Sequence, residues 1–253
     1  MNLTMPVDRP NKTSPRLTLI LAALILVAIP FGILLVDVLR DGPLSAIDQQ
    51  IANRLNTYNA QHDFAFESAR VVTQLGSTGV LTAVVIVSTG FLGLIRKRRR
   101  QALFLLTTAL LGTGLNNLVK VVVGRNRPHF EPSRVAAFGK SFPSGHAMNA
   151  TVVYCILLIL IWPWLHTRRR RLLASFGTSL LVVLIAASRV VLTVHYVSDV
   201  AAGITLGVAL VCASTAAFAA WPSDSGRLPE VATTTPPSAN RGKSTEQFRC
   251  DLG

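Results

Sequence analysis

The stretch HAMNATVVYCILLILIWPWL, residues 146–165, contains no acidic side chain, lysine or arginine. About 20 apolar residues in a helix are enough to cross the hydrocarbon core of a bilayer. The turn Pro143-Ser144-Gly145 stands directly before this stretch, and four arginines follow it at 168–171. The sequence therefore predicts a membrane-spanning helix with a polar turn at one end and positive charge at the other.

The rest of the chain repeats this apolar pattern. Half of the 253 residues are hydrophobic and 15% are charged, whereas soluble domains carry about 25% charged residues. We expect six spans, at residues 17–39, 71–95, 102–123, 146–165, 172–191 and 199–221. The expected fold is all-α: a polytopic six-transmembrane-helix bundle at 17–221, between a cytoplasmic tail at 1–16 and a disordered cytoplasmic tail at 222–253.

Basic residues indicate the orientation of this bundle. They cluster before the first expected span, at 96–100 between the second and third, and at 168–171 between the fourth and fifth. All three clusters fall on one side, which the positive-inside rule makes the cytoplasm. We therefore expect a protein of the plasma (inner) membrane with both termini cytoplasmic. These loops also explain the net charge of +13, so nucleic-acid binding is not expected.

A segment between the first two spans has a different pattern. Ile47, Ile51, Leu55 and Tyr58 recur at helical spacing, and Asp48 lies on another face. This pattern predicts an interfacial amphipathic helix on the outer membrane surface.

A pair of glycines, Gly203 and Gly207, lies in the sixth expected span. A G-x₃-G pair lets the backbone of another helix come close. Small residues are common in membrane helices, so the pair alone does not identify the neighbouring helix.

Three polar segments stand at edges of apolar runs: Lys120-x₆-Arg127-Pro128, Pro143-Ser144-Gly145-His146 and Ser188-Arg189-x₅-His195-x₃-Asp199. A phosphoryl group in transfer spreads negative charge over its oxygens, so positioning and positive charge dominate its catalysis. Lys120, Arg127 and Arg189 suit that task. The alternative is that they lie at the membrane interface, with their charged ends extending into water.

The two histidine segments carry further chemistry. Ser144 is a good helix N-cap, Gly145 lets a ligand approach the backbone, and a helix start binds anions. His195 and Asp199 are four residues apart and would share a helical face, so that Asp199 accepts the Nδ1 proton and Nε2 is free to attack. An ordinary helix cap and a structural His–Asp pair are the alternatives, and the spacing does not say whether His146 or His195 is the nucleophile.

Metal-dependent chemistry is not indicated. No Cys/His cluster has zinc spacing, and no acidic cluster suits a two-metal phosphatase. Cys155, Cys212 and Cys250 are not placed for an extracellular disulfide. We therefore expect metal-free hydrolysis.

Together, the three segments resemble the signature of the type 2 phosphatidic acid phosphatase superfamily, and every signature position is filled. The resemblance implies that His195 attacks phosphorus to form a phosphohistidine and that Asp199 orients its ring. His146 would protonate the leaving oxygen and then activate water. The residues implied to bind the phosphate are Lys120, Arg127, Ser144, Gly145 and Arg189. No cofactor is expected.

The outward-facing site points to a lipid phosphate as substrate. We rank undecaprenyl pyrophosphate first, followed by phosphatidylglycerophosphate and phosphatidic acid. A lipid phosphotransferase using the same histidine is one alternative, and a non-catalytic membrane transporter or scaffold is another. Soluble vanadium haloperoxidases share the signature but have no such spans. The sequence does not indicate an oligomeric state.

Overall fold

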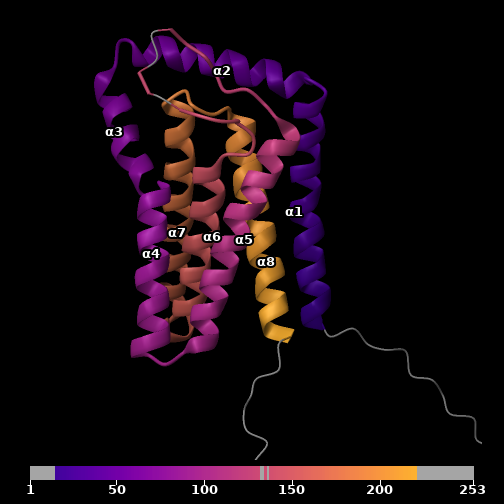
Figure 1. Ribbon diagram of the computed structural model, residues 1–253, viewed down its shortest axis with the longest axis vertical. Coiled ribbons are helices and arrows are strands. Elements are labelled where there is room, and N and C mark those ends of the chain that lie inside the picture. Colours follow the sequence, from indigo (N-terminus) through magenta and orange to yellow (C-terminus); the bar gives the residue numbers. More distant parts are fainter. Residues whose placement is uncertain (1–14, 132–133, 136, 221–253) are drawn as a thin grey trace, which may run out of the picture. The chain divides into compact units, whose positions relative to one another are not determined.

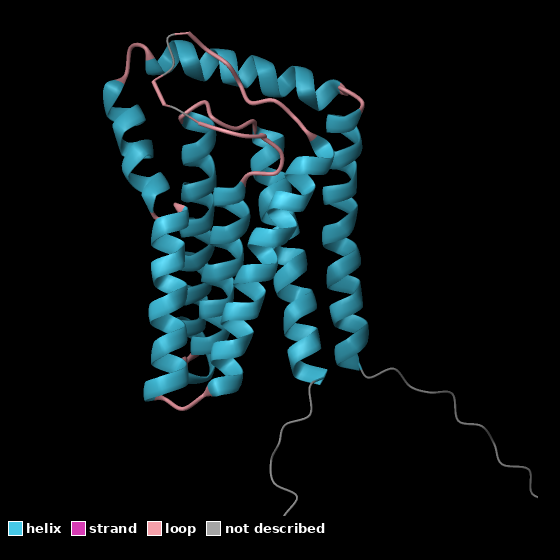
Figure 2. Ribbon diagram, in the orientation of Figure 1, coloured by secondary structure: helices cyan, strands magenta, loops and turns pink. Residues whose placement is uncertain are grey.

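The computed structural model describes residues 15–131, 134, 135 and 137–220. The predicted tails therefore lie outside the described residues, except for Pro15 and Arg16, as do Trp221 and Cys250. All regular elements of the described part are helical (Figures 1 and 2). They are α1 (Pro15–Leu39), α2 (Pro43–Asn59), α3 (Asp63–Gln74), α4 (Thr78–Gly90), the π-helix η1 (Phe91–Ile95), α5 (Arg99–Val123), α6 (Gly145–Ile161), the 3₁₀-helix η2 (Trp162–Trp164), α7 (Arg168–Val191) and α8 (Val197–Ala220).

Five segments of the described chain are long and apolar enough to cross a membrane: Asp63–Ile95, Arg99–Val123, Gly145–Trp164, Arg168–Val191 and Val197–Ala219. The predicted all-α, multi-span class is therefore confirmed. The described apolar segment of α1, Val27–Leu39, is shorter than these five, so the sixth span stays a prediction. The second expected span is preceded by α3, and the turn at residues 75–77 separates α3 from α4.

The helix predicted between the first two spans is present as α2. It lies across the end of the bundle where α5 and α7 end and α6 and α8 begin (Figure 1). Its buried residues are Asp48, Ala52 and Asn59, while Ile47 and Tyr58 are exposed. The polar side of α2 therefore faces the protein, and its location at a membrane interface stays a prediction.

The basic links lie at the opposite end of the bundle. The link between η1 and α5 and the link between η2 and α7 are both at the end away from α2 (Figure 1). In these links, the guanidiniums of Arg96 and Arg98 lie over the Trp164 ring, and that of Arg171 lies over Trp162. The structure thus separates the arginine clusters from the three polar segments, as the sequence predicted.

Two left-handed residues end helices near α2. Gly124 (φ 65°) ends α5, and its N–H donates to the Lys120 carbonyl at 3.0 Å; glycine adopts this conformation without a Cβ penalty. Thr193 (φ 53°) follows α7, where Thr193 N donates to Val190 O and Val194 N to Arg189 O. These turns direct residues 125–127 and 194–195 toward each other.

Helices α6 and α8 pack closely through the G-x₃-G pair. A Cβ added at Gly203 would lie 2.7 Å from the Ser144 carbonyl oxygen, and one at Gly207 would lie 2.9 Å from Thr151 Cβ. Only the absence of a side chain allows this approach. The predicted close helix contact is confirmed, and the partner is the helix that begins beside Ser144.

Candidate active site

The structure brings all eight predicted site residues to one end of the bundle. Lys120 is in the last turn of α5, and Arg127 is in the loop that follows. Ser144, Gly145 and His146 form the start of α6. Arg189 is in the last turn of α7, His195 lies between α7 and α8, and Asp199 is in the first turn of α8.

The His195 ring is buried and contacts a different partner through each nitrogen. Nδ1 lies 3.4 Å from Asp199 Oδ2, and Arg127 Nη1 donates to Nε2 at 2.9 Å. Because a guanidinium can only donate, Nε2 is the acceptor and Nδ1 carries the proton. Helix α8 begins at Val197, so the expectation that His195 and Asp199 share a helical face was wrong. The expected pairing is nevertheless present, because the turn before α8 brings the ring to the carboxylate.

The Asp199 carboxylate is completely buried and fully hydrogen-bonded. Its Oδ2 accepts from Ser141 Oγ and, at 2.9 Å, from Tyr196 N, while Oδ1 accepts from Arg125 Nη1 at 2.8 Å. Such contacts stabilise the ionised form of a carboxylate. The side chain beside Nδ1 of His195 therefore has a fixed orientation.

Burial and charge set the protonation of the loop residues. Burial lowers the pKa of His195 to about 4, although Asp199 opposes this shift. Burial also lowers the pKa of Arg127, again against the attraction of Asp199. The imidazole is therefore neutral at neutral pH, which is the form that can act as a nucleophile.

The start of α6 presents a buried serine and the second histidine. Ser144 is the N-cap residue, as predicted, but its hydroxyl makes no cap hydrogen bond. Its Oγ is buried and has no partner among the described residues, while its N–H donates to the Asp199 carbonyl at 2.9 Å. His146, on the first turn, is within electrostatic range of Arg127, Arg189 and His195.

The other two cations differ in their surroundings. Arg189 is buried, its Nη1 donates to Thr73 Oγ1 at 3.0 Å, and its Nε has no partner among the described residues. Lys120 Nζ donates to the Lys140 carbonyl at 2.9 Å. In the described part of the chain, no group of three or more His, Cys, Asp or Glu side chains could hold a metal ion. Lys120, Arg127 and Arg189 are the cations within electrostatic range of His146.

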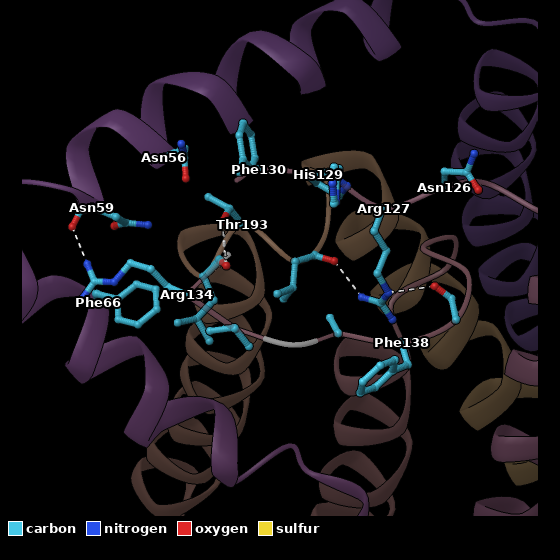
Figure 3. A pocket seen from close by; sticks show the side chains of 16 residues that line it. Asn56, Asn59, Phe66, Asn126, Arg127, His129, Phe130, Arg134, Phe138 and Thr193 are labelled. Carbon is cyan, nitrogen blue, oxygen red and sulfur yellow. Dashed lines mark hydrogen bonds between the residues drawn. The ribbon is translucent and has the colours of Figure 1, made fainter. Parts of the chain in front are cut away.

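A pocket of about 550 Å³ adjoins this cluster (Figure 3). Its walls come from α2, α3, residues 126–130, 134, 135 and 137–139, and residues 192–194, and neither His146 nor His195 lines it. Arg127 stands at its edge, where Nε donates to the Gly139 carbonyl and Nη1 to the Val194 carbonyl. The guanidinium thus lies between this pocket and the His195 ring.

Sequence reasoning missed the residues that surround the site without belonging to the three motifs. Arg125, Ser141 and Thr73 each contact a predicted site residue through the side chain. One signal was available for Arg125: it is a charged residue directly after an apolar span, two positions before Arg127. Ser141 and Thr73 have no comparable signal, because isolated hydroxyl residues occur throughout the chain.

The helices and the buried cluster define a multi-span membrane protein with a cationic, two-histidine site. The sequence model of the PAP2 superfamily matches residues 101–222. Phosphatidylglycerophosphatase B of Bacillus subtilis (strain 168) is 35% identical over 144 residues, covering 55% of this chain and 68% of that protein.

A solved structure gives the same result. The fold resembles the crystal structure of a transmembrane PAP2 type phosphatidylglycerolphosphate phosphatase from Bacillus subtilis, with a TM-score of 0.70 and 26% identity, covering 79% of this chain and 98% of that chain. The chain belongs to the PAP2 superfamily. The predictions of this family and of a phosphatase acting on lipid phosphates are confirmed.

Proposed function

We propose that the protein hydrolyses a lipid-borne phosphate or pyrophosphate at the outer face of the membrane, without a metal and through a phosphohistidine. The observation that carries this proposal is the arrangement around His195. Its Nδ1 faces Asp199 and its Nε2 faces Arg127. A phosphate oxygen bound by Arg127 would bring phosphorus beside the unprotonated nitrogen.

In the first step, Nε2 of His195 attacks phosphorus while the bond from phosphorus to the lipid oxygen breaks. Asp199 stabilises the positive charge that develops on the ring, and His146 gives its proton to the leaving oxygen. In the second step, His146 takes a proton from water, which attacks the phosphohistidine and releases inorganic phosphate. The nucleophile thereby returns to its neutral form.

The proposed phosphate site combines cations with unpaired donors. Arg127, Arg189 and Lys120 supply charge, and α6 begins at Gly145, where the first turn of a helix favours a bound anion. Arg189 Nε and Ser144 Oγ are buried without partners among the described residues. Because unpaired buried donors are costly, a bound phosphate would recover part of that free energy.

An apolar groove between the helices supports a lipid substrate. A groove of about 290 Å³ lies between α4, α5 and α6, with Leu81, Leu106 and Val153 in its walls. Asn149, one helical turn from His146, also lines this groove. It would accommodate part of an apolar chain while the headgroup reaches the site.

Phosphatidylglycerophosphate is the first candidate substrate, because the curated relative and the solved structure are both phosphatases named for it. Undecaprenyl pyrophosphate is the second. The site lies at the end opposite the arginine clusters, and a site on the outer face would suit recycling of that carrier lipid. The proposed topology has six spans, including α1, with both termini in the cytoplasm, and the proposed domain limits are 17–221.

Release of inorganic phosphate by the purified full-length protein in EDTA tests the proposal. Phosphatidylglycerophosphate, undecaprenyl pyrophosphate and phosphatidic acid are compared, and His195→Ala is expected to abolish turnover of each. His166→Ala is the matched control, because His166 lies at the opposite end of the bundle, beside η2. A ³²P-labelled protein adduct that is stable in alkali but not in acid should form with wild type and not with His195→Ala.

Two results would contradict the proposal. Equal rates for wild type and His195→Ala would remove His195 as the nucleophile. Formation of a new phosphorylated lipid in place of inorganic phosphate, when an acceptor lipid is present, would make the protein a phosphotransferase instead of a hydrolase.

A further inference from the structure

Arg125 joins two buried carboxylates that come from different parts of the chain. Nη1 donates to Asp199 Oδ1 at 2.8 Å, and Nη2 donates to Asp48 Oδ2 at 2.9 Å. The three side chains are 12%, 0% and 4% exposed, respectively. A planar guanidinium can hold two oxygens in fixed directions, which the point charge of a lysine cannot.

Asp48 also binds the start of α8. Its Oδ1 accepts from Ser198 N at 3.1 Å, and its Oδ2 accepts from Ser198 Oγ. Ser198 Oγ in turn accepts from Arg125 Nη1 at 2.7 Å. A side chain of α2 thus satisfies an N–H at the beginning of α8, immediately before Asp199.

The charges explain why the arrangement is stable. Burial acts to lower the pKa of Arg125, but Asp199 and Asp48 outweigh it and raise that pKa above its ordinary value. Without this guanidinium, two buried carboxylates would lie near each other with no cation between them. Arg125 therefore remains charged between the two carboxylates.

Fixing Oδ1 also decides where Oδ2 points. With Oδ1 held by Arg125, and Oδ2 held by Ser141 Oγ and Tyr196 N, Oδ2 is directed toward Nδ1 of His195. Rotation of the carboxylate would remove the acceptor of the Nδ1 proton and leave only the Arg127 hydrogen bond to Nε2 to favour the reactive tautomer.

We propose that Arg125, held by Asp48 of α2, is a positioning residue that orients Asp199 and thereby keeps His195 in its reactive tautomer. This inference rests on the proposed function, because it assigns His195 as the nucleophile. Arg125 acts through Asp199 and is not assigned to the phosphate site.

Arg125→Lys tests the inference, since it keeps the positive charge and removes the planar guanidinium that donates to two carboxylates. We expect kcat to fall about 100-fold, as for other small misplacements of reacting groups, while KM changes less than about 2-fold because the phosphate contacts remain. The rate of phosphohistidine formation, measured by rapid quench, should fall by the same factor as kcat.

Arg134→Lys is the matched control. Arg134 belongs to the same loop and makes similar contacts, to the Asn59 carbonyl at 2.6 Å and to Asp63 at 2.7 Å, away from Asp199. Its kcat should stay within about 2-fold of wild type.

Asp48→Asn provides a second test: it should lower kcat about 10-fold. This loss should be smaller in the Arg125→Lys background, because both substitutions act through one contact.

Imidazole ¹⁵N NMR reads the tautomer without turnover. Wild type should show His195 protonated at Nδ1 only, and Arg125→Lys should show both tautomers. An unchanged tautomer with unchanged kcat per folded molecule, together with a lower melting temperature, would make Arg125 purely structural and overturn the inference. If wild type hydrolysed no lipid, the proposed function would fail, while the NMR comparison would still decide the role of Arg125.

Discussion

Arg127 Nη1 donates a hydrogen bond to Nε2 of His195 across 2.9 Å. The cation proposed to bind phosphate therefore touches the nitrogen proposed to attack it. The carbonyls of Gly139 and Val194 hold the same guanidinium in place. In the proposed mechanism, the same small region attracts the anion and holds a neutral nucleophile directed toward it.

Replacement of Arg127 tests this contact. Arg127→Ala should lower kcat/KM for lipid phosphate by about 10³-fold, because both binding and transition-state charge stabilisation lose a charge-assisted hydrogen bond. Arg127→Lys should recover only part of the loss, since lysine lacks the fork. Steady-state kinetics measure both variants beside Arg134→Ala, and a loss of equal size in that control would contradict a specific role for Arg127.

The low pKa of His195 predicts a pH-dependent stability. Its pKa is about 4 in the folded protein, compared with 6.5 for the unperturbed group, so between these values the unfolded chain binds a proton that the folded protein does not. The contribution of neutral His195 to the free energy of unfolding is therefore fully present above about pH 6.5 and is lost as the pH falls toward 4. The melting temperature of wild type should fall more than that of His195→Gln across this window. A constant difference between the two proteins would argue against the shift.

The contact between α6 and α8 predicts a steric effect. Gly203→Ala would place Cβ 2.7 Å from the Ser144 carbonyl oxygen, so α8 must move away from the start of α6. We expect a loss of about 1–3 kcal/mol in the free energy of unfolding, as for other overpacked sites, and lower kcat because Ser144 and Asp199 are displaced. Gly177→Ala is the control, since a Cβ there meets nothing within 4 Å; thermal melting and phosphate release compare the two.

The proposed orientation predicts labelling from opposite sides. In a cysteine-free background, Phe138→Cys should react with a membrane-impermeant maleimide on intact cells, because Phe138 is 90% exposed in the loop near α2. Lys97→Cys, at the other end of the bundle, should react only after lysis. The reverse pattern would place the site in the cytoplasm and exclude the proposed topology.

Much of the fold could be predicted because its determinants are local. The length of each apolar run decides whether a helix can cross a bilayer, and five predicted spans correspond to such helices. Gly203 and Gly207 indicated a close helix contact, because two helix backbones can approach each other where no side chain separates them. His195 and Asp199 could be paired from their spacing alone, although the turn before α8, rather than a shared helical face, brings them together.

The tertiary structure decided which residues contact the proposed reacting groups. Arg125 and Asp48 are 77 residues apart, and Asp48 and Ser198 are 150 apart, so no periodicity in the sequence links them. The sequence placed Asp48 on a non-apolar face of an amphipathic helix, but only packing of α2 across the bundle showed that this face is directed inward. The sequence by itself determined five apolar helices and the three motif segments, because these depend on local length, composition and spacing. The tertiary structure determined their partners, because a buried charge is stabilised by whichever opposite charge folding brings within reach.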